Sequence, residues 1–169
     1  MNIIVGHVLW LFLIWVCFPM VALDVLAEPG LGSSAPSKPL AVSERVKPSQ
    51  AFHFAYQDYL KGHYDLALSE FQQVVEDFPE SSFAAEAYYY IGECYDQQGD
   101  LKEAARALTT LIEQHGTSRQ VPAALFKLGK IYEKAGQPHK AKAFWHELIK
   151  GFRGSPEAEL ARRRLKRIP

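Results

Sequence analysis

The sequence predicts an all-α, right-handed helical solenoid of three helix hairpins followed by a C-terminal capping helix. One observation is a period of 37 residues between Gly62, Gly99 and Gly136, each of which falls at a predicted turn. A second is that several residue classes keep this register. These positions are Ala67, Ala104 and Ala141; Phe71, Leu108 and Trp145; Val74, Leu111 and Leu148; Ser81, Ser118 and Ser155. A third is apolar spacing at i, i+3, i+4 and i+7 inside each predicted helix.

The amino-terminal segment predicts export. Residues 1–22 are almost wholly apolar, and Val25 and Ala27 supply the small residues of a cleavage site, so residues 1–27 are interpreted as a signal peptide. The segment carries no Lys or Arg before its apolar run, which is also long enough for an uncleaved membrane anchor. Cleavage is the favoured alternative. Cys17 follows Trp15 and Val16, which does not fit the small residues of a lipoprotein signal.

Residues 28–47 are rich in Pro, Gly and Ser and predict a flexible linker. The repeat domain then occupies residues 48–169, with repeats at about 48–80, 81–117 and 118–154 and a cap at 155–169. The chain has a formal net charge of zero, so no overall field favours nucleic acid or anionic lipid.

The helices are predicted in order along the repeat domain. The first repeat gives helices over residues 48–61 and 64–78, and Ser81 is expected to cap the next helix. The second repeat gives two helices joined at Gly99 and Asp100. The third gives helices over residues 121–135 and 139–152. The last helix, residues 156–167, has acidic residues at its start and basic residues toward its end, which complements the helix dipole. It is interpreted as the polar cap of the solenoid.

Small residues at fixed positions predict close helix packing within each hairpin. Gly92 and Ala104 of the second repeat, and Gly129 and Ala141 of the third, are expected to let the two helices of a hairpin approach closely.

These positions resemble the tetratricopeptide repeat. The repeat has a small residue in its first helix, an aromatic three residues later and a small residue in its second helix. Gly92, Tyr95 and Ala104 match this pattern, as do Gly129, Tyr132 and Ala141. The first repeat matches through Ala55, Ala67, Phe71 and Pro79, but has Asp58 where the aromatic belongs.

The link between repeats, FPESSFAAEA at residues 78–87, is similar to that of two envelope families. One is the Tol-Pal-associated periplasmic family CpoB, also called YbgF, and the other is the outer-membrane assembly family BamD. Residues 55–57 and 61–65 are particularly similar to the opening of the CpoB repeat domain. A short linker replaces the coiled coil of CpoB-type proteins, and the lipoprotein signal and additional repeats of BamD-type proteins are absent.

The CpoB resemblance implies a periplasmic protein–protein interaction adaptor in Tol-Pal-linked envelope constriction and cell division. The alternatives are a BamD-like outer-membrane protein assembly factor and an accessory subunit of an envelope enzyme complex. The expected partner is an envelope protein or peptide segment. No nucleic acid is expected, and a membrane association only if residues 1–27 are retained, which would leave the protein anchored in the inner membrane and facing the periplasm.

No catalytic arrangement is present in the sequence. There is no Gly-rich phosphate loop, metal-spaced His pair or nucleophile elbow, so neither an enzyme, nor a cofactor, nor a metal site is expected. Cys94 is interpreted as a buried helix residue.

The predicted binding site is a groove lined by the first helix of each repeat. The 37-residue register places Phe52, Tyr89 and Phe126 at one groove position. The other predicted groove residues are Tyr56, Glu93 and Lys130; Tyr59, Asp96 and Glu133; and Lys127. The alternative is that the aromatics only pack between repeats. The family's carboxylate clamp is not expected, because Tyr89 and Glu93 occupy its positions. The basic cluster at residues 162–167 is interpreted as a solvated cap, with binding of an acidic protein or phosphate as the alternative.

Overall fold

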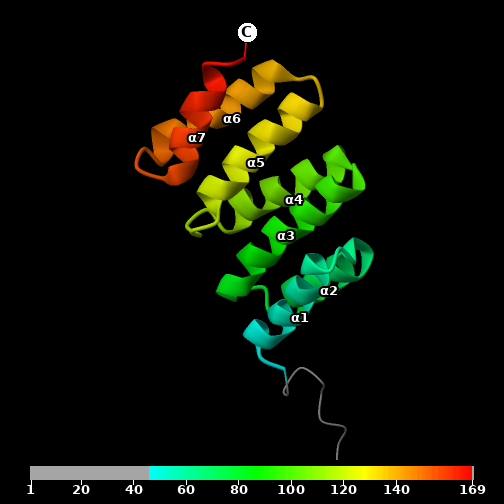
Figure 1. The fold of residues 1–169 in the computed structure, drawn as a ribbon. Coiled ribbons are helices and arrows are strands. Elements are labelled where there is room, and N and C mark those ends of the chain that lie inside the picture. The colour runs from blue at the N-terminus through cyan, green and yellow to red at the C-terminus, as the bar shows by residue number, and fades with distance from the viewer. Residues whose placement is uncertain (1–45, 169) are drawn as a thin grey trace, which may run out of the picture. The chain divides into compact units, whose positions relative to one another are not determined.

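The computed structural model describes residues 46–168, and the regular secondary structure in this range is entirely helical. The predicted leader, residues 1–27, and nearly all of the predicted linker, residues 28–47, lie outside the described residues. The helices are α1 (Pro48–Leu60), α2 (Tyr64–Asp77), α3 (Ser82–Gln98), α4 (Leu101–Gln114), α5 (Val121–Lys134), α6 (Pro138–Gly151) and α7 (Pro156–Leu165). They form three antiparallel hairpins and a final helix (Figure 1), so the predicted fold class is confirmed.

The turn inside each hairpin depends on a glycine. Gly62, Gly99 and Gly136 have φ angles of 82°, 85° and 71°. Side chains with a Cβ rarely adopt this left-handed conformation, which ends a helix and reverses the chain. The 37-residue glycine period therefore marks the positions where the chain turns between the first and second helix of a repeat.

Side-chain caps start the helices that follow the longer links. The Ser81 hydroxyl accepts a hydrogen bond from the Phe83 amide at 3.2 Å, and the Ser155 hydroxyl accepts one from the Ala158 amide at 3.1 Å. Ser118 differs, because its hydroxyl accepts from the Gln120 amide and α5 begins only at Val121. The link before the third repeat is therefore longer than the register of serines indicates.

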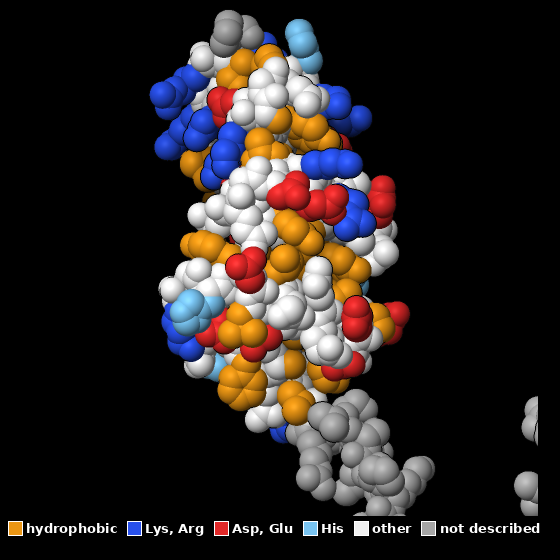
Figure 2. Space-filling model, turned by 90° about the vertical axis from the view of Figure 1, so that its right-hand side faces the viewer, with side chains coloured by type: hydrophobic (Ala, Val, Ile, Leu, Met, Phe, Trp, Pro, Cys, Tyr) orange, Lys and Arg blue, Asp and Glu red, His pale blue; other side chains and the backbone are white. Residues whose placement is uncertain are grey.

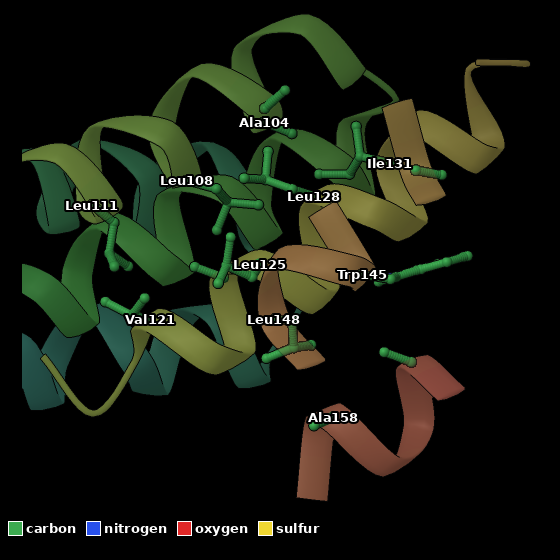
Figure 3. Close-up of a cluster of buried hydrophobic side chains, with 14 residues drawn as sticks. Ala104, Leu108, Leu111, Val121, Leu125, Leu128, Ile131, Trp145, Leu148 and Ala158 are labelled. Carbon is green, nitrogen blue, oxygen red and sulfur yellow. The ribbon is translucent and has the colours of Figure 1, made fainter. Parts of the chain in front are cut away.

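Adjacent hairpins pack through the second helix of one and the first helix of the next. Helix α2 packs on α3, α4 packs on α5, and α6 packs on α7. One apolar cluster fills the space among α1 to α4, and a second extends from α4 to α7. Figure 3 shows the second cluster, in which Leu108 and Leu111 of α4 meet Leu125 and Leu128 of α5, with Trp145 of α6 nearby.

The predicted small residues lie at close helix contacts. Ala104 and Ala141 are fully buried. A Cβ added at Gly92 would lie 2.8 Å from Leu108 Cγ and 3.3 Å from the Ala104 carbonyl oxygen. At Gly129 it would lie 2.0 Å from Trp145 Nε1. The second and third hairpins therefore each pack a larger side chain of the second helix against a bare glycine in the first.

Among the helices in residues 46–168, none has both the length and the apolar character that crossing a membrane requires.

Candidate functional site

The first helices of the hairpins, together with α7, form one continuous face. Helix α1 contacts α3 directly, α5 contacts α7, and Lys127 of α5 pairs with Glu93 and Asp96 of α3. The first helices of neighbouring repeats are therefore joined to one another along one side of the repeats. We call their shared surface, at the register positions of Phe52, Tyr56 and Tyr59 in each repeat, the inner face.

A network of polar contacts joins α1, α3 and α5 across this face. Lys127 Nζ of α5 lies 2.7 Å from Glu93 Oε1 and 2.8 Å from Asp96 Oδ2, both on α3. The Tyr59 hydroxyl of α1 donates to Glu93 Oε2 at 3.4 Å. Lys134 Nζ, at the end of α5, lies 2.9 Å from Asp96 Oδ1. Four of the predicted groove residues are thus brought together, and they bind one another.

The Lys127 and Asp96 charges of this network are held in their ionised forms. Burial alone would lower the pKa of Lys127, but hydrogen bonds to Asp96 and Glu93 outweigh it and raise that pKa above its usual value. Burial alone would raise the pKa of Asp96, but hydrogen bonds from Lys127 and Lys134 outweigh it and lower that pKa. Burial, followed by the Glu93 charge, raises the pKa of Tyr59, which keeps its hydroxyl protonated as a donor.

Lys127, one of the predicted groove residues, is buried between the second and third repeats. Its side chain is only 8% exposed and already has two carboxylate partners. A buried charge must be paired, because an unpaired one loses its hydration without compensation. Lys127 therefore joins the second repeat to the third and is not available to a ligand.

The assignment of Phe52 to the groove is also wrong. It is 9% exposed, and its ring packs against Phe71 of α2 and Phe83 and Tyr90 of α3, at centroid distances of 5.4, 5.5 and 5.8 Å. In the first repeat, the aromatic residue at this register position belongs to the hydrophobic core, because α2 and α3 supply three rings that cover it. For Phe52 the alternative of packing between repeats is the correct one.

Tyr56 and Tyr59 share this packing while remaining partly exposed. Their rings lie 5.0 and 5.1 Å from the ring of Tyr90, in edge-on contacts. Burial, with a hydrogen bond to Tyr56, raises the pKa of Tyr90 to about 12. Tyr90 was not among the predicted site residues; it follows Tyr89 directly and corresponds to Lys127 in the repeat register.

Tyr89 and Phe126 remain partly exposed on the inner face. The Tyr89 ring makes an edge-on contact with Tyr90 at 5.5 Å. Burial, then the charge of Glu93 and a hydrogen bond to it, raises the pKa of the Tyr89 hydroxyl. Phe126 lies against Trp145, whose Nε1 donates to the Phe126 carbonyl at 3.2 Å.

The inner face continues onto α7, which the sequence analysis treated as a separate surface. Phe126 and Lys130 of α5, with residues of α7, line a pocket of about 330 Å³. The α7 residues are Leu160, Arg163, Arg164 and Arg167. Arg164 Nη1 also lies 3.0 Å from Glu133 of α5. Arg163, Arg164 and Arg167 lie 37 residues after Phe126, Lys127 and Lys130. The repeat register therefore already indicated that α7 continues the inner face.

A second hollow, of about 450 Å³, lies where α2, α3 and α4 meet. Arg106 in its lining pairs with Glu103 at 2.6 Å. This hollow involves second helices and contains none of the predicted groove residues.

Comparison with known families identifies the repeats. Two family models described as tetratricopeptide repeat match residues 59–118 and 123–155, which together make up more than half of the chain. The protein belongs to the tetratricopeptide repeat family. The matched segments span the region from the end of α1 through α6, and the resemblance expected from Gly92, Tyr95 and Ala104 is therefore confirmed.

Several solved structures share the fold. The Yersinia enterocolitica type III secretion chaperone SycD, in complex with a peptide of the translocator YopD, is 17% identical with a TM-score of 0.59, over 70% of this chain and 86% of that chain. The Arabidopsis OM64 TPR domain is 12% identical with a TM-score of 0.59, over 71% and 94%. MamA is 21% identical with a TM-score of 0.54, over 68% of this chain and 66% of its own. No curated protein sequence matches the chain.

Within residues 46–168, this tetratricopeptide repeat protein has no group of three His, Cys, Asp or Glu side chains arranged to hold a metal ion. Cys94 is fully buried on α3, as predicted, and burial raises the pKa of its thiol to about 12. The thiolate form that reacts or binds metal is therefore disfavoured at Cys94.

Proposed function

We propose that the protein is an exported protein–protein interaction adaptor that holds a segment of an envelope partner along its inner face. The observation that carries this proposal is the C-terminal part of that face. There, Phe126 and Lys130 of the third repeat and α7 line a pocket that no other part of the described chain fills. A partly exposed aromatic beside exposed charges is the usual composition of a protein-binding surface.

The inner face has two parts with different roles. The network around Lys127 holds the repeats together, and the pocket beside Phe126 is left for a partner. The Tyr59, Glu93 and Lys127 contacts connect the first helices of all three repeats. Because these charges are already paired, they hold the curvature of the solenoid and leave recognition to the residues around Phe126. A pre-formed surface of this kind loses little conformational entropy on binding.

The fold neighbours support a peptide as the ligand. The structure of SycD contains a peptide of its translocator partner. Sequence identity of 17% makes this a likeness of fold, and the extension to a peptide ligand for the present protein belongs to the proposal.

The finer part of the proposal follows the resemblance to CpoB. It places the protein in the periplasm, with leader residues 1–27 removed, and assigns it to Tol-Pal-linked envelope constriction at division. The support is the apolar run at residues 1–22, the small residues Val25 and Ala27, and the CpoB-like link at residues 78–87. The intact mass of the exported protein tests the leader: a species beginning at Glu28 supports cleavage, and a membrane-bound species retaining residues 1–27 contradicts it.

In-cell photo-crosslinking tests the adaptor function. Benzoylphenylalanine incorporated in place of Lys130, on the inner face, is expected to yield a defined adduct with one partner protein. The same group in place of Lys102, exposed on α4, is the matched control and is expected to yield none. A Tol-Pal component in the adduct supports the CpoB-like role, and an outer-membrane assembly component supports the BamD-like alternative. Equal adducts from both positions, or adducts from Lys102 alone, would refute inner-face binding.

A further inference from the structure

Charge is divided sharply along the solenoid. Residues 46–117, the first two repeats, carry 12 Asp and Glu against 4 Lys and Arg, whereas residues 118–168 carry 4 against 13. The net charge of zero for the whole chain conceals this division. Figure 2 views the molecule from one side, where Lys and Arg side chains lie mainly over the C-terminal helices and Asp and Glu side chains mainly over the earlier repeats.

The pocket between α5 and α7 lies in the basic half. Its four cationic residues are Lys130, Arg163, Arg164 and Arg167. Arg164 is partly neutralised by Glu133 at 3.0 Å. Among the described residues, no carboxylate lies within ion-pair distance of Lys130, Arg163 or Arg167, and all three are exposed. The pocket therefore has three cations that no carboxylate of the described chain neutralises.

The same pocket contains apolar surface. Phe126 of α5 is partly buried, and Leu160 of α7 is 44% exposed. Leu160 is the exposed large hydrophobic residue of α7, on a helix that is otherwise strongly polar. An apolar side chain placed between Phe126 and Leu160 would remove both from water, which is favourable in proportion to the area covered.

We propose that this pocket is a subsite for an acidic peptide segment of a partner protein, with one apolar side chain between Phe126 and Leu160 and flanking carboxylates on Lys130, Arg163 and Arg167. The inference rests on the adaptor function proposed above and specifies the chemistry of the partner. Arg favours carboxylates because its planar guanidinium donates two parallel hydrogen bonds. The acidic first two repeats repel the carboxylates of the segment, so the division of charge places its acidic part at the C-terminal end of the inner face.

Fluorescence anisotropy with the full chain and synthetic peptides tests this chemistry. The probe is a labelled peptide of about 12 residues with one Leu flanked by Asp and Glu. Two matched peptides replace the acidic residues by Asn and Gln, or the Leu by Ser. The acidic Leu peptide is expected to bind saturably, at least about tenfold more tightly than either control peptide, and more weakly as ionic strength rises.

Two protein variants locate the binding. Arg163→Gln with Arg167→Gln is expected to weaken binding of the acidic peptide at least about tenfold, since each variant removes an exposed charge-assisted contact. Lys150→Gln with Arg153→Gln makes the same change of charge outside the pocket and is expected to leave binding within about twofold. Leu160→Ser, at an exposed position, tests the apolar half separately and is expected to reduce the preference for the Leu peptide over the Ser peptide.

Three outcomes would overturn the subsite. The first is equal binding of the acidic and amide peptides, and the second is equal loss in the pocket and control variants. The third is salt-sensitive self-association of the protein alone in sedimentation, abolished by Arg163→Gln with Arg167→Gln, because the pocket would then serve the acidic repeats of a second copy. If any of these occurs while benzoylphenylalanine at position 130 still captures one partner, the adaptor function stands and only its proposed chemistry fails.

Discussion

The indole of Trp145 lies against the bare backbone of Gly129, and a Cβ at residue 129 would stand 2.0 Å from Trp145 Nε1 and 2.4 Å from Cε2. The same indole donates a hydrogen bond to the Phe126 carbonyl at 3.2 Å, one turn earlier on α5. Trp145 is fully buried, so it has no free space into which it can move. This contact fixes α6 against α5 directly behind Phe126, which lines the pocket between α5 and α7.

Gly129→Ala is expected to destabilise the protein by roughly 1–3 kcal/mol, because the added methyl displaces a buried ring in a packed core. Gly151→Ala is the matched control, since a Cβ there meets no atom within 4 Å. It is expected to leave the free energy of unfolding unchanged or to increase it by up to about 1 kcal/mol. Urea unfolding of both variants measures the difference, and equal stabilities would contradict the close contact.

The Lys127 pair with Glu93 and Asp96 predicts a large effect of removing the cation. Lys127→Met leaves two carboxylates close together, with side chains only 13% and 16% exposed and without their main counter-ion. We expect a loss of about 3 kcal/mol in the free energy of unfolding. Lys102→Met, an exposed position on α4, is the control and is expected to stay within about 0.5 kcal/mol of wild type. A Lys127 variant as stable as this control would show that the network does not hold the repeats together.

The same network predicts the pH dependence of stability. Asp96 has a folded-state pKa below its ordinary value of 3.8, so its contribution to stability is present above that pH and is lost as pH falls below it. Lys127 has a folded-state pKa above 10.5, so its contribution is present below that pH and is lost as pH rises above it. The stability difference between wild type and Asp96→Asn should therefore be constant near neutrality and shrink below about pH 3.8. A difference that stays constant into that acid range would contradict the assignment.

One register position is exposed in the first repeat and buried in the next two, which gives a matched series of substitutions. Phe54, Ile91 and Leu128 are 37 residues apart. Ile91 and Leu128 are 5% and 0% exposed because a preceding hairpin covers them, whereas Phe54, on the first helix, is 59% exposed. Ile91→Ala and Leu128→Ala should each cost about 2–5 kcal/mol. Phe54→Ala should change stability by no more than about 0.5 kcal/mol. Thermal unfolding of the three variants checks this, and a Phe54 effect as large as the others would mean that another part of the chain covers α1.

Much of the fold was predictable because it depends on local and periodic signals. The glycine period fixed the turns at Gly62, Gly99 and Gly136, since only a glycine tolerates their backbone conformation. Apolar spacing then located the helices, whose observed ends differ from the predicted ones by a residue or two. Helix α5 begins at Val121 as predicted, but the serine register did not reveal that the Ser118 hydroxyl accepts from the Gln120 amide in the preceding turn and does not cap the helix.

The candidate site was predicted less well. The repeat register indicates on which face of its helix a residue lies, but not which side chains of the adjacent helices cover it. Phe52, Tyr89 and Phe126 share a position, yet Phe52 is buried by rings from α2 and α3 that no single-helix pattern reveals. Lys127 was expected to be exposed, but its length lets it reach two carboxylates on the adjacent first helix. The contribution of α7 was missed because the register was not carried past the third repeat.

The most direct test of inner-face binding is titration of the partner captured at position 130 with Tyr89→Ala and Phe126→Ala. Each variant is expected to weaken binding by about 2 kcal/mol, or roughly 30-fold, because large aromatics are the usual anchors of such surfaces. Leu66→Ala, an apolar residue of α2 that is 49% exposed, is the control and should bind like wild type. If Tyr89→Ala and Phe126→Ala keep the native melting temperature and bind as tightly as wild type, the inner face is not the binding surface.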